Sequence, residues 1–323
     1  MQPTMITFKS YSSLRRMICI YFANLCMLKE ANNWRCLAMG TEGERVIRDH
    51  WKVKYNKNGY PHVQQGWVLP PDKMTEYDPF ILMADDWFKR GTFSDHPHRG
   101  FQTITYVIDG RLEHTDNNGG HSVLYSGDVQ YMNAGSGARH AEEAVDDDLI
   151  HTLQLWLNLP KALKGTKSSY QNVLVEDAPK VGIDGGYLRI YSGEAEGVKG
   201  PMDSLVPINM FELYLKEGES YSLKLPQNHN GHIYMLQGEM TFADKVTLGK
   251  TEAGLLSYQK EADDEEFDHL NIKANERSRM LIYTGKPINE SVVARGPFVM
   301  NTEDEIHEAF NDFRMGRFGP SSQ

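Results

Sequence analysis

The chain has 323 residues, of which 40% are hydrophobic and 24% charged, and its formal net charge is −10. This composition is typical of a soluble globular protein, and no apolar run approaches the ~20 residues of a membrane-spanning helix. An acidic surface repels a phosphate backbone, which argues against direct nucleic-acid binding and favours a small molecule or a protein as partner.

Residues 1–39 differ in composition from the rest of the chain. They contain five Lys or Arg, one Glu and all three cysteines, Cys19, Cys26 and Cys36, so the remaining residues have no thiol for a disulfide or a metal. This distribution fits a reducing compartment, and we expect a cytoplasmic protein. We predict a poorly ordered extension or a natural start at Met39. Two arginines before the apolar "MICIYFANLCML" leave a targeting signal open as an alternative.

From about residue 45 the chain consists of short runs of β-formers separated by Gly, Asp, Asn and Pro, which predicts an all-β protein built from barrels or sandwiches. "TYVIDGRLEHTD…SGDVQYM" near residues 105–132 is echoed by "IYMLQGEMTF…TEAGLLSYQ" near residues 233–259. The repeat predicts two similar domains in tandem, an N-terminal one over residues 40–180 and a C-terminal one over residues 181–323.

The first candidate functional motif is "SDHPHRGFQTITYVIDG". In a strand, residues i and i+2 face the same side, so His96 and His98 should project together. Pro97 between them favours an edge strand or the start of a strand. Taken alone the pair is a weak signal, because ordinary packed or exposed histidines give the same pattern.

A second pair with the same spacing, His140 and Glu142, follows in "GSGARHAEEAV". Three imidazoles and one carboxylate from two strands can converge inside a barrel. This ligand set suits a first-row divalent ion and leaves coordination positions for water or substrate. The two motifs together therefore predict a metal site.

Other residues have plainer interpretations. We predict that His114 and His121, which flank the turn "TDNNGG", are exposed, and that the acidic run at residues 261–268 is a solvated loop. His151 begins the alternating strand "HTLQLWLNL" and is a candidate for supporting the site. No Gly-rich phosphate loop and no Gly-x-Ser-x-Gly motif is present, so nucleotide-dependent transfer and serine hydrolysis lack support. Five residues near the predicted ligands could line a flat apolar pocket or belong to the barrel core: Phe93, Phe101, Tyr106, Tyr131 and Met132.

One helix is predicted at the C-terminus, in "NTEDEIHEAFNDFRMGRFG". Thr302 and Glu305 have the spacing of a capping box, and Gly316 can end the helix. The apolar stripe that would pack on a barrel is formed by Ile306, Ala309, Phe310 and Phe313.

With these residues in hand, the chain resembles the pirins, a family of two-barrel proteins in the cupin superfamily. The resemblance rests on "DHPHRGFQTITYVIDG", "SGDVQYMNAGSGARHAEE", "LQLWLNLP" and "GPFVMNTEDEIHEAFNDFRMGRFG", and spans roughly residues 45–319. It implies two tandem cupin (jelly-roll) barrels packed face to face, with a short C-terminal helix. It also implies one metal ion in the N-terminal barrel, held by His96, His98, His140 and Glu142.

The usual cupin glutamate falls at Gln102, a departure that we expect to tune the charge of the site. The second barrel lacks the ligand spacing. His229 and His232 lie three apart in the loop-like "PQNHNGHIY", and we expect this barrel to hold no metal.

The resemblance implies a metal-dependent dioxygenase that uses O₂ on quercetin-like flavonols or a related aromatic enol. Glu142 would relay the substrate's hydroxyl proton. Fe(II) is the expected ion, and Mn, Ni, Co or Cu remain open. The alternative is a non-enzymatic, redox-sensitive regulator that binds a transcription factor or a metabolic enzyme.

Overall fold

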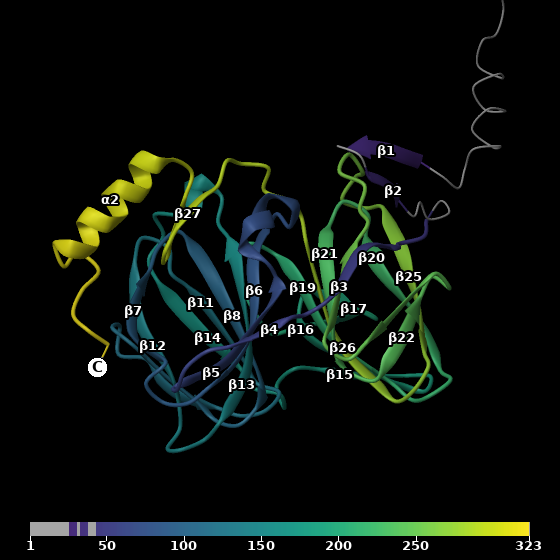
Figure 1. Ribbon diagram of the computed structural model, residues 1–323, viewed down its shortest axis with the longest axis horizontal. Helices are drawn as coiled ribbons and strands as arrows, with labels where there is room; N and C mark the ends of the chain where they lie inside the picture. Colours follow the sequence, from purple (N-terminus) through teal and green to yellow (C-terminus); the bar gives the residue numbers. More distant parts are fainter. Residues whose placement is uncertain (1–25, 31–32, 38–42, 323) are drawn as a thin grey trace, which may run out of the picture.

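The computed structural model describes residues 26–30, 33–37 and 43–322. Two similar β-barrels lie side by side, the first drawn in blue and teal and the second mostly in green (Figure 1). Each barrel is a sandwich of one seven-stranded and one four-stranded sheet, and the named strand pairs of these sheets are antiparallel. The predicted all-β, two-barrel fold is confirmed.

The first barrel contains both motifs singled out in the sequence. Its larger sheet has the strand order β14 (Ser169–Val173), β11 (Val129–Asn133), β8 (Phe101–Asp109), β13 (Ile150–Asn158), β6 (Phe80–Phe88), β5 (His62–Leu69) and β4 (Tyr55–Lys57). Its smaller sheet has the order β10 (His121–Leu124), β9 (Leu112–Asp116), β12 (Ala138–Ala144) and β7 (Phe93–His98). Two short 3₁₀ turns, Pro71–Glu76 and Lys161–Leu163, connect strands of this barrel.

The second barrel repeats this plan. Its larger sheet has the order β15 (Lys180–Ile183), β16 (Gly186–Ser192), β19 (Ile208–Leu215), β26 (Ser278–Gly285), β21 (Asn230–Gln237), β24 (Glu252–Leu256) and β3 (Ile47–Lys52). Its smaller sheet has the order β20 (Ser220–Pro226), β25 (Phe267–Ala274), β22 (Glu239–Phe242) and β23 (Val246–Gly249). Two-strand pairs outside the barrels are β17 (Glu194–Ala195) with β18 (Val198–Lys199), and β27 (Val293–Arg295) with β28 (Phe298–Met300).

One strand crosses between the barrels. Residues 47–52, which the predicted division at residue 180 assigns to the N-terminal barrel, form β3 and pair with β24 of the second barrel. The next strand, β4, pairs with β5 in the first barrel. Residues 47–57 therefore join the larger sheets of both barrels.

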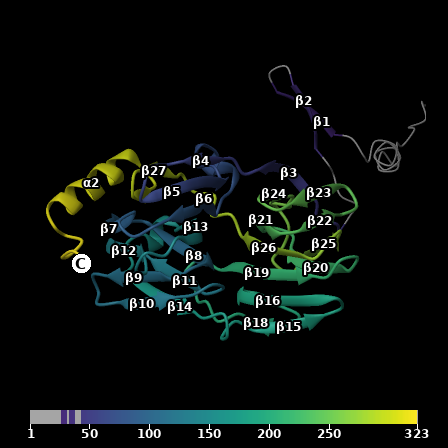
Figure 2. The same ribbon diagram turned by 60° about the horizontal axis from the view of Figure 1, so that its bottom comes forward.

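The two larger sheets face each other across a shared apolar core (Figure 2). This core contains Ile104 and Leu155 from the first barrel and Tyr234 and Leu281 from the second. The interior of the second barrel holds a separate hydrophobic cluster, with Phe211 and Leu270 among its members. The first barrel has no comparable cluster among the described residues, because polar side chains occupy part of its interior.

Alternation along the strands decides which side chains enter each core. In β25 every second residue is buried, from Asp268 to Ala274. Most of the acidic run at residues 261–268 is exposed, as predicted. Asp268 is the exception, because it begins the buried face of β25 and lies 3.7 Å from the guanidinium of Arg45.

The C-terminal helix α2 (Glu303–Arg314) lies on the outer side of the first barrel (Figure 1). Its capping box is confirmed: the Glu305 backbone N–H donates to the Thr302 side chain, and the Glu305 carboxylate accepts from the Thr302 backbone N–H. Its apolar stripe packs with Phe298 of β28 and with Phe318, which follows the helix. Each of the four predicted stripe residues belongs to this cluster.

The extension predicted over residues 1–39 lies mostly outside the described residues. Within it, β1 (Cys26–Glu30) pairs with β2 (Asn33–Leu37) in a small antiparallel sheet. The predicted start at Met39 and most of the possible targeting signal lie on residues that are not described. In the described part of the chain, the helices are too short or too polar to span a bilayer.

His232 makes the stability of the fold pH-dependent. It lies in β21, not in the loop predicted for it, stacked on Tyr283 and edge-on to Phe80. Burial lowers the pKa of His232 from 6.5 to about 3. Below pH 6.5 the unfolded chain gains a proton that the folded protein does not bind, so stability is lost as the pH falls toward 3, by at most about 1.4 kcal/mol per pH unit.

We therefore expect His232→Leu to flatten the fall in unfolding free energy between pH 7 and pH 5, measured by urea denaturation at several pH values. His307→Leu, at an exposed position of α2, is the control and should keep the wild-type slope. Equal slopes for His232→Leu and wild type would contradict this assignment.

Candidate metal centre

Three of the four predicted ligands come together where β7 and β12 pair. The antiparallel register sets His96 opposite His140 and His98 opposite Ala138, and alternation turns all three imidazoles into the barrel. The ring centroids are 4.4 Å (His96–His140), 4.7 Å (His96–His98) and 4.9 Å (His98–His140) apart. The Nε2 atoms of His96 and His98 are 3.1 Å apart.

The fourth predicted ligand, Glu142, belongs to a second group that shares His140. One ligand atom each from His114, His140 and Glu142 lies within 4.8 Å of the others, and the same holds for His96, His98 and His140. A bulge between His140 and Glu142 sets Glu142 opposite Phe93 of β7 and beside His114 of β9. The predicted ligands thus form two overlapping groups.

The prediction that His114 is exposed is wrong. In β9 the side chains of Leu112, His114 and Asp116 are buried while those between them are less so, and His114 packs against His140 with ring centroids 5.5 Å apart. The alternation in "LEHTD" was the available signal, but the adjacent turn residues concealed it. The exposed position of His121 is confirmed, since its side chain is 62% exposed and paired with Glu113.

Glu142 is held by neutral donors. Its Oε1 accepts a hydrogen bond from the Thr105 hydroxyl at 2.9 Å, and its Oε2 accepts one from Gln154 Nε2 at 2.5 Å. Burial raises the pKa of Glu142, while the charge of His96 and these two hydrogen bonds act in the opposite direction. Thr105 and Gln154 lie on β8 and β13 of the facing sheet, so both sheets position this carboxylate. The sequence analysis missed these two residues.

The histidines are suited to lone-pair donation. Burial lowers the pKa of both His98 and His140 well below 6.5, with the neighbouring imidazoles acting in the same direction. Neutral imidazoles are the form that binds a metal. Within the described part of the chain, neither ring nitrogen of the fully buried His140 has a hydrogen-bond partner. Such an unsatisfied buried group requires an explanation, and a metal ion bound by these nitrogens provides one.

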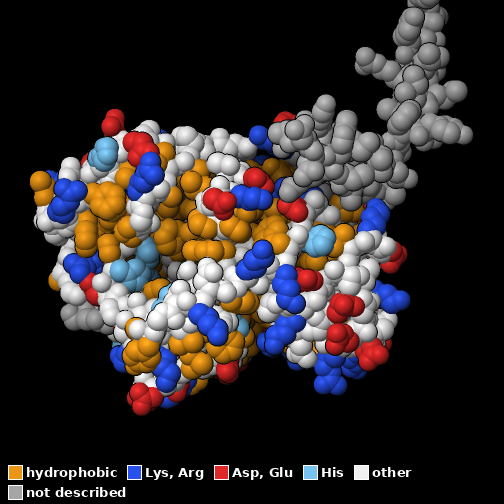
Figure 3. All heavy atoms as spheres, in the orientation of Figure 1, with side chains coloured by type: hydrophobic (Ala, Val, Ile, Leu, Met, Phe, Trp, Pro, Cys, Tyr) orange, Lys and Arg blue, Asp and Glu red, His pale blue; other side chains and the backbone are white. Residues whose placement is uncertain are grey.

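The site reaches the surface at one side. His96 and Trp156 are partly exposed, whereas His98 and Phe101 are buried. Trp156 stacks on Phe101 with centroids 4.1 Å apart, and both rings contact His98 edge-on. Figure 3 shows histidine side chains at the surface of the first barrel among hydrophobic ones. Phe101 and Trp156 therefore form an aromatic surface beside the histidines.

The other residues considered for a flat pocket are mainly core residues. Tyr106 and Tyr131 belong to the core between the barrels, and the Tyr106 hydroxyl donates to Glu212 of the second barrel at 2.7 Å. Phe93 packs edge-on against Phe88. Met132 is buried in a small cluster inside the first barrel.

Gln102 and His151 point away from the site. The Gln102 side chain accepts from Tyr131 Oη at 2.7 Å and from the Leu205 backbone N–H at 3.1 Å. It faces the second barrel, so the expectation that it tunes the charge at the histidines is wrong. His151 also faces the second barrel, where its Nε2 lies 2.6 Å from Asp85 Oδ1.

The segment after His98 ties the site to the C-terminal part of the chain. Arg99 pairs with Asp312 of α2 at 3.0 Å, and its guanidinium lies over the Phe318 ring. Gly100 has φ 85° and packs so closely on the Val299 backbone that a Cβ would overlap it. The buried Lys164 ammonium donates to the carbonyls of Gly100 and Val299. In the His-Pro-His-Arg-Gly motif, the two histidines therefore point into the barrel, while the Arg and Gly contact the C-terminal part of the chain.

Two cupin-type barrels, one of them carrying a buried histidine cluster, define the class as a bicupin. The family model described as Pirin matches residues 64–157, and the model described as Pirin C-terminal cupin domain matches residues 210–319. Pirin from Rattus norvegicus is 36% identical over 246 residues, covering 75% of this chain and 83% of that protein. The chain belongs to the pirin family.

Solved structures agree with this fold. The crystal structure of quercetin 2,3-dioxygenase from Acinetobacter baumannii matches with a TM-score of 0.76 and 30% identity, covering 87% of this chain and 100% of that one. Bacterial pirin YhhW from Escherichia coli, crystallised in complex with nickel(II), matches with a TM-score of 0.59 and 20% identity, covering 74% of this chain and 100% of that one. At 20% identity the second match shows the fold.

The hydrogen bond from Thr105 to Glu142 should contribute measurably to the free energy of unfolding. Thr105→Val leaves a buried carboxylate oxygen without its donor, so we expect the metal-free protein to lose about 1–3 kcal/mol of unfolding free energy. Thr103→Val, at a buried position two residues earlier on the same strand, is the matched control and should cost less, because Thr103 does not bind Glu142. Urea denaturation in EDTA measures both, and equal losses would contradict a specific role for Thr105.

Proposed function

We propose that His96, His98, His140 and Glu142 hold one divalent metal ion in the first barrel. The supporting observation is the convergence of three buried or half-buried imidazoles, with both ring nitrogens of His140 unpartnered in the described structure. Fe(II) is the ion we favour, and Mn, Ni, Co and Cu also suit imidazole and carboxylate ligands. The bacterial pirin YhhW, which shares this fold, was crystallised in complex with nickel(II), and this supports a divalent metal in the present chain.

The activity we propose is dioxygenation of a quercetin-like flavonol or a related aromatic enol. Its support is the likeness to quercetin 2,3-dioxygenase over most of the chain. Overall, the flavonol and O₂ give a ring-opened depside and carbon monoxide. When bound, a divalent ion supplies a Lewis acid for the vicinal hydroxyl and keto oxygens of such a substrate.

The chain's own residues bind the substrate and take its proton. The Phe101 and Trp156 stack beside His98 offers an aromatic surface to a flat ring system. Glu142 accepts the hydroxyl proton, and Thr105 and Gln154 keep its carboxylate in place during the transfer. The half-buried His96 and Trp156 mark the side from which the substrate enters.

Metal binding should stabilise the folded protein, since only the folded chain brings these ligands together. A ligand at about 100 times its dissociation constant contributes about 2.7 kcal/mol. We expect a divalent ion to raise the Tm of the wild type and of His121→Ala, whose exposed imidazole lies outside the site. His140→Ala should show no such rise. Differential scanning calorimetry with and without EDTA tests this, and a metal-dependent rise in His140→Ala would contradict the ligand set.

Activity is tested by anaerobic reconstitution with each ion in turn, followed by O₂ uptake and loss of quercetin absorbance. We expect turnover with at least one ion, none in His98→Ala, and a fall of about 10²–10⁴-fold in Glu142→Gln that retains metal. His121→Ala should match the wild type. Stoichiometric metal binding without turnover would contradict the oxygenase proposal and favour the second function, a redox-sensitive regulator that binds a protein.

A further inference from the structure

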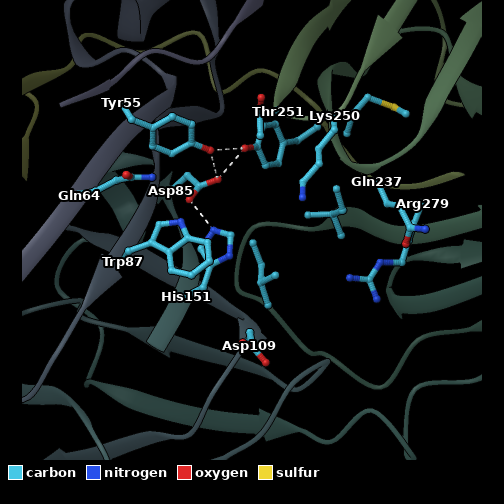
Figure 4. A pocket seen from close by; sticks show the side chains of 14 residues that line it. Tyr55, Gln64, Asp85, Trp87, Asp109, His151, Gln237, Lys250, Thr251 and Arg279 are labelled. Carbon is cyan, nitrogen blue, oxygen red and sulfur yellow. Dashed lines mark hydrogen bonds and ion pairs between the residues drawn. The ribbon is translucent and has the colours of Figure 1, made fainter. Parts of the chain in front are cut away.

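A second chemically distinctive place is the cavity between the two barrels. It has a volume of about 480 Å³, a size typical of sites for small organic molecules. One wall comes from β4, β6, β8 and β13 of the first barrel, and the other comes from β21, β26 and the turn before β24 in the second. Figure 4 shows these walls facing each other across an open space.

The first wall is organised around a buried carboxylate. Asp85 is 1% exposed, and its Oδ2 accepts hydrogen bonds from Tyr55 Oη at 2.8 Å and from Tyr234 Oη at 2.5 Å. Its Oδ1 lies 2.6 Å from Nε2 of His151. Because a carboxylate only accepts, this arrangement requires Nε2 of His151 to carry the hydrogen.

His151 therefore presents its other ring nitrogen, Nδ1, to the cavity. Its ring is fixed from two sides, by Asp85 and by a stack on Trp87 with centroids 3.9 Å apart. In the neutral ring with hydrogen on Nε2, the second nitrogen, Nδ1, has a free lone pair, and no residue of the described chain donates to it. Figure 4 shows this nitrogen on the side of the ring away from Asp85.

The opposite wall is cationic. Lys250 and Arg279 line it, and neither pairs with a carboxylate within 4.0 Å among the described residues. Glu212, on the neighbouring strand β19, accepts hydrogen bonds from the Tyr106 and Tyr187 hydroxyls. Two cations that line one cavity without forming an ion pair among the described residues are suited to a carboxylate.

The apolar parts of the lining set the shape of the occupant. Ile108, Met235 and Leu236 also line the cavity, together with the Trp87–His151 stack. Asp109 also lines the cavity, at the end away from Lys250 in Figure 4, so a negative group is favoured only at the Lys250 end. The occupant therefore needs a flat apolar middle with one anionic group.

We propose that this cavity binds a small aromatic hydroxy acid. Its carboxylate pairs with Arg279 and Lys250, its ring lies against the apolar lining, and its hydroxyl donates to Nδ1 of His151. The site goes beyond the proposed oxygenase function, because it lies on the other face of the sheet from the histidine cluster. Asp85 faces this cavity, whereas the next residue, Asp86, lines a small space beside Glu142 inside the first barrel.

The test uses isothermal titration calorimetry of the full-length protein with 4-hydroxybenzoate as the probe. We expect binding that Arg279→Gln weakens at least tenfold, and that His98→Ala, at the proposed metal centre, leaves unchanged. Lys260→Gln, an exposed lysine outside the cavity, is the matched control and should bind as the wild type does. Lys250→Gln, at an exposed turn position, provides a second cavity variant should Arg279→Gln melt early.

The hydroxyl contact is tested separately by comparing 4-hydroxybenzoate with benzoate. The wild type should prefer the hydroxylated acid, and His151→Phe should remove this preference. No binding at millimolar concentration would overturn the proposal, as would equal affinities for Lys250→Gln, Arg279→Gln and Lys260→Gln. Loss of binding in His98→Ala alone would assign the probe to the histidine cluster and also overturn it.

Discussion

The two-residue period of the β-strand is the constraint on which this molecule depends. Each large sheet must fill two spaces at once, the gap between the barrels and the interior of its own barrel, so neighbouring residues have opposite tasks. In β8, Ile104 and Tyr106 pack against the second barrel, while Thr105 between them reaches inward to Glu142. A shift of one residue in register would turn the core residues into the barrel and the inward residues toward the second barrel. Both the core between the barrels and the interior of the first barrel would then be disrupted.

The two barrels use this common plan for different purposes. In the second barrel a cluster of apolar inward residues, with Phe211, Met240 and Leu270 among them, packs in a continuous core. In the first barrel the corresponding space holds imidazoles and a carboxylate, whose burial costs free energy unless partners satisfy them. The apolar core between the barrels and the hydrophobic cluster of the second barrel stabilise a fold in which the first barrel's interior holds the histidine cluster.

The local sequence pattern predicted the positions of side chains that are set by a single strand. It failed for side chains whose position depends on which strands pair with one another. His96, His98 and His140 were found because i, i+2 spacing fixes the face of a side chain without further knowledge. His114 was missed because its place beside His140 depends on the pairing of β9 with β12. Gln102 was misassigned for a related reason, since its match to the usual cupin glutamate position does not say which face of β8 it occupies.

The same limit explains β3. Its residues are compatible with an edge strand of either barrel, and only the long-range pairing with β24 decides between them. Non-local contacts also give the His-Pro-His-Arg-Gly segment a structural role, besides supplying two histidines to the cluster. Arg99 and Gly100 meet α2 and β28, elements about 200 residues later in the chain, so the conformation beside His98 depends on the C-terminal region being in place.

Strands β6 and β13 line two spaces at once, the cavity between the barrels and the interior of the first barrel. Asp85 and His151 face the cavity between the barrels, and the residues that follow them, Asp86 and Thr152, line the interior beside Glu142. Gln154, which holds Glu142, lies on the same strand as His151. The backbone that fixes one site therefore fixes the other, and neither strand can move to suit one space without displacing side chains in the second.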